Sequence, residues 1–186
     1  MQSGQHPDIS PLPGCAAASA QRIAEGALDG QYLTVRLGGE EFGIDIMKVH
    51  EVREYEAPLP IADAPPGVRG VLNLRGAIVP VVDLRQQFAL PQVAFDEDTV
   101  TVILSLGGRP FGAVIDAVSD VTRLDRAQIK PVPGFEVPMV ANYLVAMGVQ
   151  QRAGKQRMIL LMDIERVIAG AGLETAPAPG DATLQS

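Results

Sequence analysis

The chain has 186 residues, 47% hydrophobic and 20% charged, and this composition is typical of a folded domain rather than a disordered chain. Its net charge of −7 and its 4% content of aromatic residues disfavour nucleic-acid or anionic-membrane binding, which needs clustered lysine and arginine. A single cysteine excludes an internal disulfide, and no apolar run reaches the roughly 18 residues that cross a bilayer, so we predict a soluble cytosolic chain.

The two ends of the chain differ in composition from its middle. Residues 1–29 are rich in Ala, Gly, Pro, Ser and Gln without a sustained hydrophobic period, and residues 171–186 share that character. We therefore predict two disordered tails. The folded domain is expected over residues 30–170.

Two β-hairpins are predicted in the middle of the chain. Residues 33–37 alternate between apolar and polar side chains, and a Gly-Gly pair at 38–39 then leads into a second apolar run that starts at Phe42. Residues 100–106 show the same alternation before a Gly-Gly pair at 107–108.

The two hairpins belong to an internal repeat. LGGEEFGIDIMKVHEV at 37–52 and LGGRPFGAVIDAVSDV at 106–121 share glycines, a phenylalanine, an acid and a closing valine at a constant offset of 69. AIVPVVDL at 77–84 and RMILLMDI at 157–164 extend the likeness. Two similar β units in succession predict an all-β fold of two small barrels, because closure removes exposed strand edges.

Helix signals are few and short. Asp83 with Gln86, and Asp125 with Gln128, have the spacing of a capping box, and IERVIAG after Asp163 is a third short helix or a strand end. We expect each of the two capping-box segments to form a turn or two of helix.

Side chains for catalysis are scarce. The only histidines are His6, in a predicted tail, and His50, in a predicted strand. GVQQRAGK at 148–155 has one residue too many between its glycines for a phosphate-binding loop, and we interpret it as a polar hairpin loop. We therefore predict no catalytic residue, no metal site and no cofactor.

Several motifs together resemble one family, the CheW adaptors of bacterial chemosensory arrays. They are, in chain order, EEFGIDIMKVHEVREY, GVRGVLNLRGAIVPVVDLR, AVIDAVSDV, IKPVPGF and MILLMDIERV. The resemblance covers residues 31–169 and implies two intertwined five-stranded SH3-like barrels with a few short helical turns. It places subdomain one at about 31–79 plus 156–169, and subdomain two at about 80–155.

The resemblance also implies a function. Proteins similar to CheW are not enzymes, and they bridge the cytoplasmic tip of chemoreceptors, the methyl-accepting chemotaxis proteins, and the CheA histidine kinase. The expected partners are therefore a receptor tip and the regulatory domain of the kinase, with no nucleic acid and no membrane insertion. The expected location is the cytoplasm, at membrane-associated arrays.

Arg75 stands out because it is surrounded by apolar residues that favour burial. In the family that the chain resembles, the matching arginine and glutamate lie beside the groove where the receptor docks. We predict an ion pair between Arg75 and Glu51 at the rim of an apolar groove lined by Val49, Val118 and Val121, and we assign these five residues to receptor binding. The alternative is a surface pair that stabilises the fold by only ~0.2 to 1 kcal/mol.

The IKPVPGF segment is a second candidate surface. Phe135 follows a Pro-Gly turn, so its ring either folds back into the core or is exposed as part of an interface. The resemblance implies that this loop meets the kinase, and we assign Lys130 and Phe135 to kinase binding. The packing of Phe135 in the core is an alternative that the sequence leaves open.

Two other function classes compete with an adaptor. A barrel with an apolar interior could bind a small ligand, and a thermal-shift screen with metabolites would test this. An OB-like nucleic-acid binder is disfavoured by the negative charge and by the shortage of aromatic residues.

Overall fold

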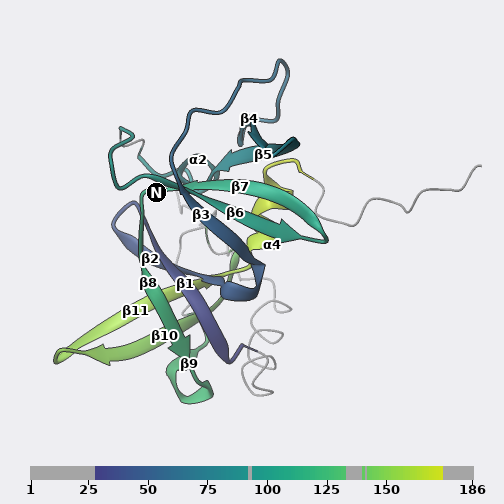
Figure 1. The fold of residues 1–186 in the computed structure, drawn as a ribbon. Helices are drawn as coiled ribbons and strands as arrows, with labels where there is room; N and C mark the ends of the chain where they lie inside the picture. Colours follow the sequence, from purple (N-terminus) through teal and green to yellow (C-terminus); the bar gives the residue numbers. More distant parts are fainter. Residues whose placement is uncertain (1–27, 92–93, 133–139, 141, 174–186) are drawn as a thin grey trace, which may run out of the picture.

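The computed structural model describes residues 28–91, 94–132, 140 and 142–173, and it confirms the predicted all-β class (Figure 1). In spatial order, the six-stranded sheet contains β8 (Ala117–Leu124), β1 (Gly30–Leu37), β2 (Glu40–Asp45), β11 (Lys155–Met162), β10 (Leu144–Arg152) and β9 (Ile129–Lys130). The five-stranded sheet contains β3 (Val49–Glu54), β6 (Val100–Leu106), β7 (Arg109–Ile115), β5 (Ala77–Asp83) and β4 (Val68–Leu74). Each sheet forms an SH3-like barrel, and the sixth strand beyond the predicted five is the two-residue β9.

Short helical segments follow several of the strands, as predicted. They are α2 (Leu84–Gln87), α4 (Ile164–Gly170) and the 3-10 helices η1 (Ile46–Lys48) and η2 (Arg126–Gln128). Asp83 and Asp163 cap α2 and α4, and Asp125 forms a complete capping box with Gln128 before η2. Among the described residues, no helix is long and apolar enough to cross a membrane.

In the part of the chain that the structure describes, four two-residue turns close antiparallel hairpins. Both residues of each turn have a positive φ, which matches the right-handed twist of the flanking strands. Gly-Gly pairs at 38–39 and 107–108 form two of these turns, as predicted. The predicted polar loop at 148–155 is shorter than expected, because β10 continues to Arg152 and the turn consists of Ala153 and Gly154.

The structure explains how the two repeats are intertwined. The third strand of the first repeat, β3, pairs with β6 of the second repeat, and the third strand of the second repeat, β8, pairs with β1 of the first. Both strands carry a bulge at the same position: His50 is skipped between Val49 and Glu51, and Ser119 is skipped between Val118 and Asp120. Each sheet is therefore built from a hairpin of one repeat and strands of the other, three of them (β3, β4 and β5) in the five-stranded sheet and four (β8 to β11) in the six-stranded sheet.

The sheets divide the chain at different places from the subdomains that the resemblance implied. The five-stranded sheet takes β3, β4 and β5 from the first half, whereas the range 80–155 assigned to subdomain two contains β8 and β10 of the other sheet. The five-stranded sheet is formed by the continuous stretch from Val49 to Ile115, and the six-stranded sheet is formed by the strands before and after that stretch.

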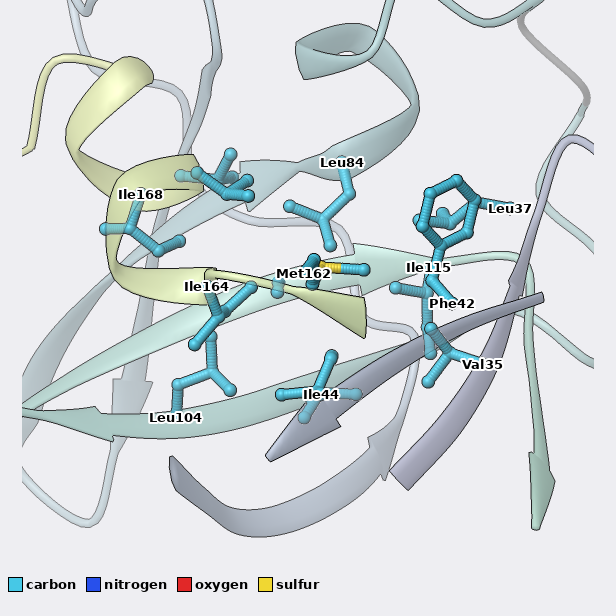
Figure 2. Close-up of a cluster of buried hydrophobic side chains, with 14 of the residues drawn as sticks. Val35, Leu37, Phe42, Ile44, Leu84, Leu104, Ile115, Met162, Ile164 and Ile168 are labelled. Carbon is cyan, nitrogen blue, oxygen red and sulfur yellow. The ribbon is translucent and has the colours of Figure 1, made fainter. Parts of the chain in front are cut away.

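The main hydrophobic core lies between the two sheets. Leu104 and Ile115 of the five-stranded sheet face Val35 and Ile44 of the six-stranded sheet (Figure 2). Side chains of α2 and α4 pack against the same cluster. Each barrel also has a smaller interior cluster, which contains Leu124 and Leu161 in one barrel and Leu72, Val81 and Val114 in the other.

The Phe-Gly pair of each repeat lies where a strand arrives from far along the chain. β11 pairs in parallel with β2, so that Leu161 lies opposite Gly43, and β5 pairs in parallel with β7, so that Val81 lies opposite Gly112. A Cβ atom on Gly43 would come within 2.7 Å of the Leu161 side chain. Glycine at this position allows the incoming strand to approach closely.

The boundaries of the predicted tails need a small correction. Leu28 and Ala171, which the sequence analysis placed in the tails, are buried at 5% and 3% exposure. Their apolar side chains pack against the two larger core clusters, so the ordered domain begins and ends slightly beyond 30–170. The remainder of both predicted tails, 1–27 and 174–186, lies outside the described residues.

Candidate functional site

Arg75 occupies a turn rather than a strand. It is the first of the two turn residues between β4 and β5, with a φ of 51°, and Gly76 follows with a φ of 89°. The Asn73 side chain accepts a hydrogen bond from the Gly76 backbone N–H at 2.9 Å and fixes the turn. The turn leaves the Arg75 side chain 80% exposed.

The predicted ion pair between Arg75 and Glu51 is present. The Arg75 Nη2 atom lies 3.6 Å from the Glu51 Oε2 atom, and the Glu51 side chain is 28% exposed. The pair links β3 to the β4–β5 turn, which are the two edges of the five-stranded sheet. An ion pair this long, at the surface, contributes at most ~1 kcal/mol to folding. The exposed Arg75 guanidinium can therefore leave Glu51 and contact a partner at little cost.

Two of the predicted groove residues belong to the shared core. Val49 and Val118 occupy equivalent positions at the start of β3 and β8, and both are half-buried against the main hydrophobic cluster. The bulge that follows each valine shifts the register, so the acid two positions later pairs with the neighbouring hairpin.

Val121 lies in a different setting. Its side chain is 53% exposed, and it lines a hollow of about 380 Å³ together with Asp120, Arg152 and Arg157. None of the other four residues that the sequence analysis assigned to receptor binding lines this hollow. The five predicted residues thus lie on both barrels, with Glu51 and Arg75 on one and Val121 on the other.

A network of ion pairs lies beside Val121 and connects strands of the six-stranded sheet. The sequence analysis did not predict it. Arg157 donates to both oxygens of Glu41 at 2.7 and 2.8 Å, and to both oxygens of Asp120 at 3.0 Å. Arg152 donates to the same Asp120 at 2.7 Å. Asp120 belongs to β8 and both arginines to the β10–β11 hairpin, so the network joins strands that are not neighbours in the sheet order.

The network shifts the pKa values of its members. The hydrogen bonds from Arg157, and then from Arg152 and Thr122, lower the pKa of Asp120 from 3.8 to about 2 despite partial burial. Arg157 also lowers the pKa of Glu41, while both carboxylates raise the pKa of Arg157. All three groups therefore stay charged near neutral pH. A signal for this network was present in the sequence, because the repeat places Asp120 at the position of Glu51.

A second buried network connects the two sheets. Arg85, only 3% exposed, donates to both oxygens of Asp83 at 3.0 Å and to Asp116 at 3.4 Å. Asp116 also accepts from the Gly38 backbone N–H at 2.8 Å, in the turn of the other sheet. The sequence analysis predicted only a capping role for Asp83. The burial of Arg85 between the two sheets could not be predicted from the sequence, because no local motif or spacing indicates it.

The two residues assigned to kinase binding have different outcomes. Lys130 is exposed and pairs with Met147 through β9 and β10, at the end of the six-stranded sheet. Phe135 lies outside the described residues. The position of its ring therefore stays an expectation from the sequence.

The remaining polar residues have structural roles. His50 is exposed at the β3 bulge, and Asp45, the last residue of β2, caps η1. Lys48 forms an ion pair with Glu165. Within the described ranges, no group of three or more His, Cys, Asp or Glu side chains could hold a metal ion.

Comparisons of the sequence and the fold with known proteins show which family the chain belongs to. The model of the CheW-like domain matches residues 31–171. The chain is 43% identical over 152 residues to the chemotaxis protein CheW of Klebsiella aerogenes, covering 82% of this chain and 89% of that protein. It is 31% identical over 146 residues to CheW of Rhizobium meliloti, covering 78% and 92%. The scaffolding protein TtCheW of Thermoanaerobacter tengcongensis has a similar structure, with a TM-score of 0.66, 26% identity and coverage of 76% and 93%. The chain therefore belongs to the CheW-like family.

Proposed function

We propose that this chain is a non-enzymatic adaptor that couples chemoreceptors to the CheA histidine kinase in chemotaxis signalling. The observation that carries the proposal is the match of the CheW-like domain over 31–171, which spans both barrels. The similar proteins are named chemotaxis proteins or, for the solved structure, a scaffolding protein. Such an adaptor acts in the cytoplasm, at membrane-associated receptor arrays.

The receptor tip docks, in this proposal, where β3 and the β4–β5 turn meet. Glu51 and Arg75 present a carboxylate and an exposed guanidinium there, and Ile78, 64% exposed on β5, adds apolar surface close in sequence to the turn. A helical partner could contact such a surface through both its polar and its apolar side chains. Val49, Val118 and Val121 complete the proposed receptor-binding set.

Replacing Arg75 by alanine tests the receptor surface. We expect the affinity for a receptor-tip fragment to fall about fivefold, which corresponds to ~1 kcal/mol for one exposed charge pair. Alanine is preferable to glycine, because glycine would relax the positive φ at this turn and change its stability. Isothermal titration calorimetry measures the affinity, and thermal unfolding shows whether the fold is retained.

Lys155→Ala is the matched control for this experiment. Lys155 is exposed at the start of β11 and forms no ion pair among the described residues. We expect the control to bind the fragment as the parent does. Equal affinities of Arg75→Ala and the parent would remove Arg75 from the receptor surface.

The kinase contact is proposed at the end of the six-stranded sheet. Lys130 provides an exposed ammonium group at this end, and Phe135 is assigned from the sequence. Phe135→Ser is expected to weaken the pulldown of the kinase regulatory domain. An undiminished pulldown by a folded variant would contradict the assignment.

Co-sedimentation tests the proposed function as a whole. Membranes that carry receptors are mixed with the kinase, with and without the full chain, and the pelleted kinase is measured. The adaptor is expected to increase the amount of kinase in the pellet, through contacts that are individually of modest area. Kinase recovery that is independent of the chain would refute the coupling role.

A further inference from the structure

We propose that the hollow beside Val121 is a second docking surface, which takes an acidic segment of the receptor tip. This inference rests on the proposed adaptor function and adds to it a site on the other barrel. The hollow has a volume of about 380 Å³. Its lining residues come from β8, η2 and the β10–β11 hairpin: Asp120, Val121, Thr122, Arg123, Gln128, Gln150, Gln151, Arg152 and Arg157.

The repeat makes this surface a counterpart of the Glu51–Arg75 surface. Asp120 and Val121 stand 69 positions after Glu51 and Val52, and both pairs follow the same bulge on a third strand. Val52 and Val121 are 43% and 53% exposed. In each barrel, therefore, an acid and an exposed valine are consecutive residues of an edge strand.

Each surface also has an arginine at a hairpin turn, although the two arginines differ by one position in their hairpins. Arg75 follows the last residue of β4, and Arg152 is the last residue of β10, so each lies where a hairpin turns. Arg152 contacts Asp120 at 2.7 Å with its side chain 68% exposed, just as Arg75 contacts Glu51 with its side chain 80% exposed. Surfaces with the same side-chain types in the same local arrangement are suited to the same kind of partner.

The charge of the hollow indicates which partner atoms it takes. Asp120 and Glu41 neutralise two of the arginines, Arg152 and Arg157. Arg123 is exposed on β8 and has no ion-pair partner among the described residues, so a positive charge remains on a chain whose net charge is −7. A carboxylate can accept hydrogen bonds from the exposed Arg123 guanidinium and from the glutamine amides beside it, so an acidic side chain fits this hollow.

Charge reversal of Arg123 tests this surface. The full chain with Arg123→Glu is titrated with the receptor-tip fragment at low and at physiological salt. We expect the affinity to fall about tenfold at low salt and the salt dependence to weaken, because an attraction between opposite charges becomes a repulsion. Arg126→Glu makes the same change of charge on η2, outside the hollow lining, and is expected to change the affinity less than about twofold.

Each outcome separates this inference from the proposed function. If the parent binds the fragment and Arg123→Glu binds equally well, the second surface is refuted while the adaptor function stands. Equal losses in the Arg123 and Arg126 variants would show a general effect of charge and would also refute it. A parent chain that fails to bind receptor tips would overturn both. A loss of affinity for the kinase domain alone would exclude the receptor as the occupant.

Discussion

Arg85→Met is expected to lower the free energy of unfolding by about 3 to 5 kcal/mol, because it removes one partner of a buried ion pair. The Arg85 and Asp83 side chains are each 3% exposed, and the two guanidinium contacts with Asp83 measure 3.0 Å. Methionine fills similar volume but leaves the Asp83 carboxylate buried, with Arg69 at 3.7 Å as its remaining cation. Urea denaturation followed by circular dichroism measures the change.

A double variant separates the lost pair from the lost packing. Asp83→Asn keeps a residue that can cap α2, since asparagine caps helices as well as aspartate does. Combined with Arg85→Met it leaves no unpaired buried charge, so the double variant is expected to be more stable than the sum of the two single changes predicts. Arg166→Met, at an ion-paired arginine whose side chain is 57% exposed, is the control and should cost less than ~1 kcal/mol. Additive losses in the double variant would contradict the role of charge burial.

The Arg85 network joins the two barrels. Asp83 ends β5 of the five-stranded sheet, and Asp116 binds the β1–β2 turn of the six-stranded sheet through Gly38. Arg85 contacts both acids. The relative position of the two proposed docking surfaces therefore depends on this arginine as well as on the shared hydrophobic core.

The sequence predicted the features that repeat or alternate along the chain. Alternating residues and Gly-Gly pairs predicted both hairpins, and the offset of 69 predicted two similar β units. The offset does not reveal which hairpin receives the third strand of each repeat, since either pairing satisfies the same pattern. The exchange of β3 and β8 therefore became visible only in the structure.

The sequence predicted only part of the candidate site, because most of its contacts join residues that are far apart along the chain. The pair of Glu51 and Arg75 followed from a family motif, but the turn at Arg75 did not, because arginine is uncommon at a positive φ. Asp120 was visible as the repeat equivalent of Glu51. Its arginine partners, Arg152 and Arg157, lie more than 30 residues further along the chain and had no spacing signal.

The network around Arg157 should make the stability of the fold sensitive to acid. Arg157 is 13% exposed and contacts two carboxylates, so Arg157→Met is expected to cost about 2 to 3 kcal/mol near neutral pH. The pKa of Asp120 is lowered in the folded state from 3.8 to about 2, and that of Glu41 is lowered too.

A carboxyl group with a lowered folded-state pKa stabilises the fold at pH values above its unfolded-state pKa, and this contribution is lost as the pH falls through the folded-state value. The parent should therefore lose stability steeply between about pH 4 and pH 2, and Arg157→Met should lose much less over the same interval. Lys155→Met, on the same strand and outside the network, should follow the parent. Urea midpoints measured from pH 7 to pH 2 test this, and parallel curves for the parent and Arg157→Met would show that the network does not hold the barrel closed.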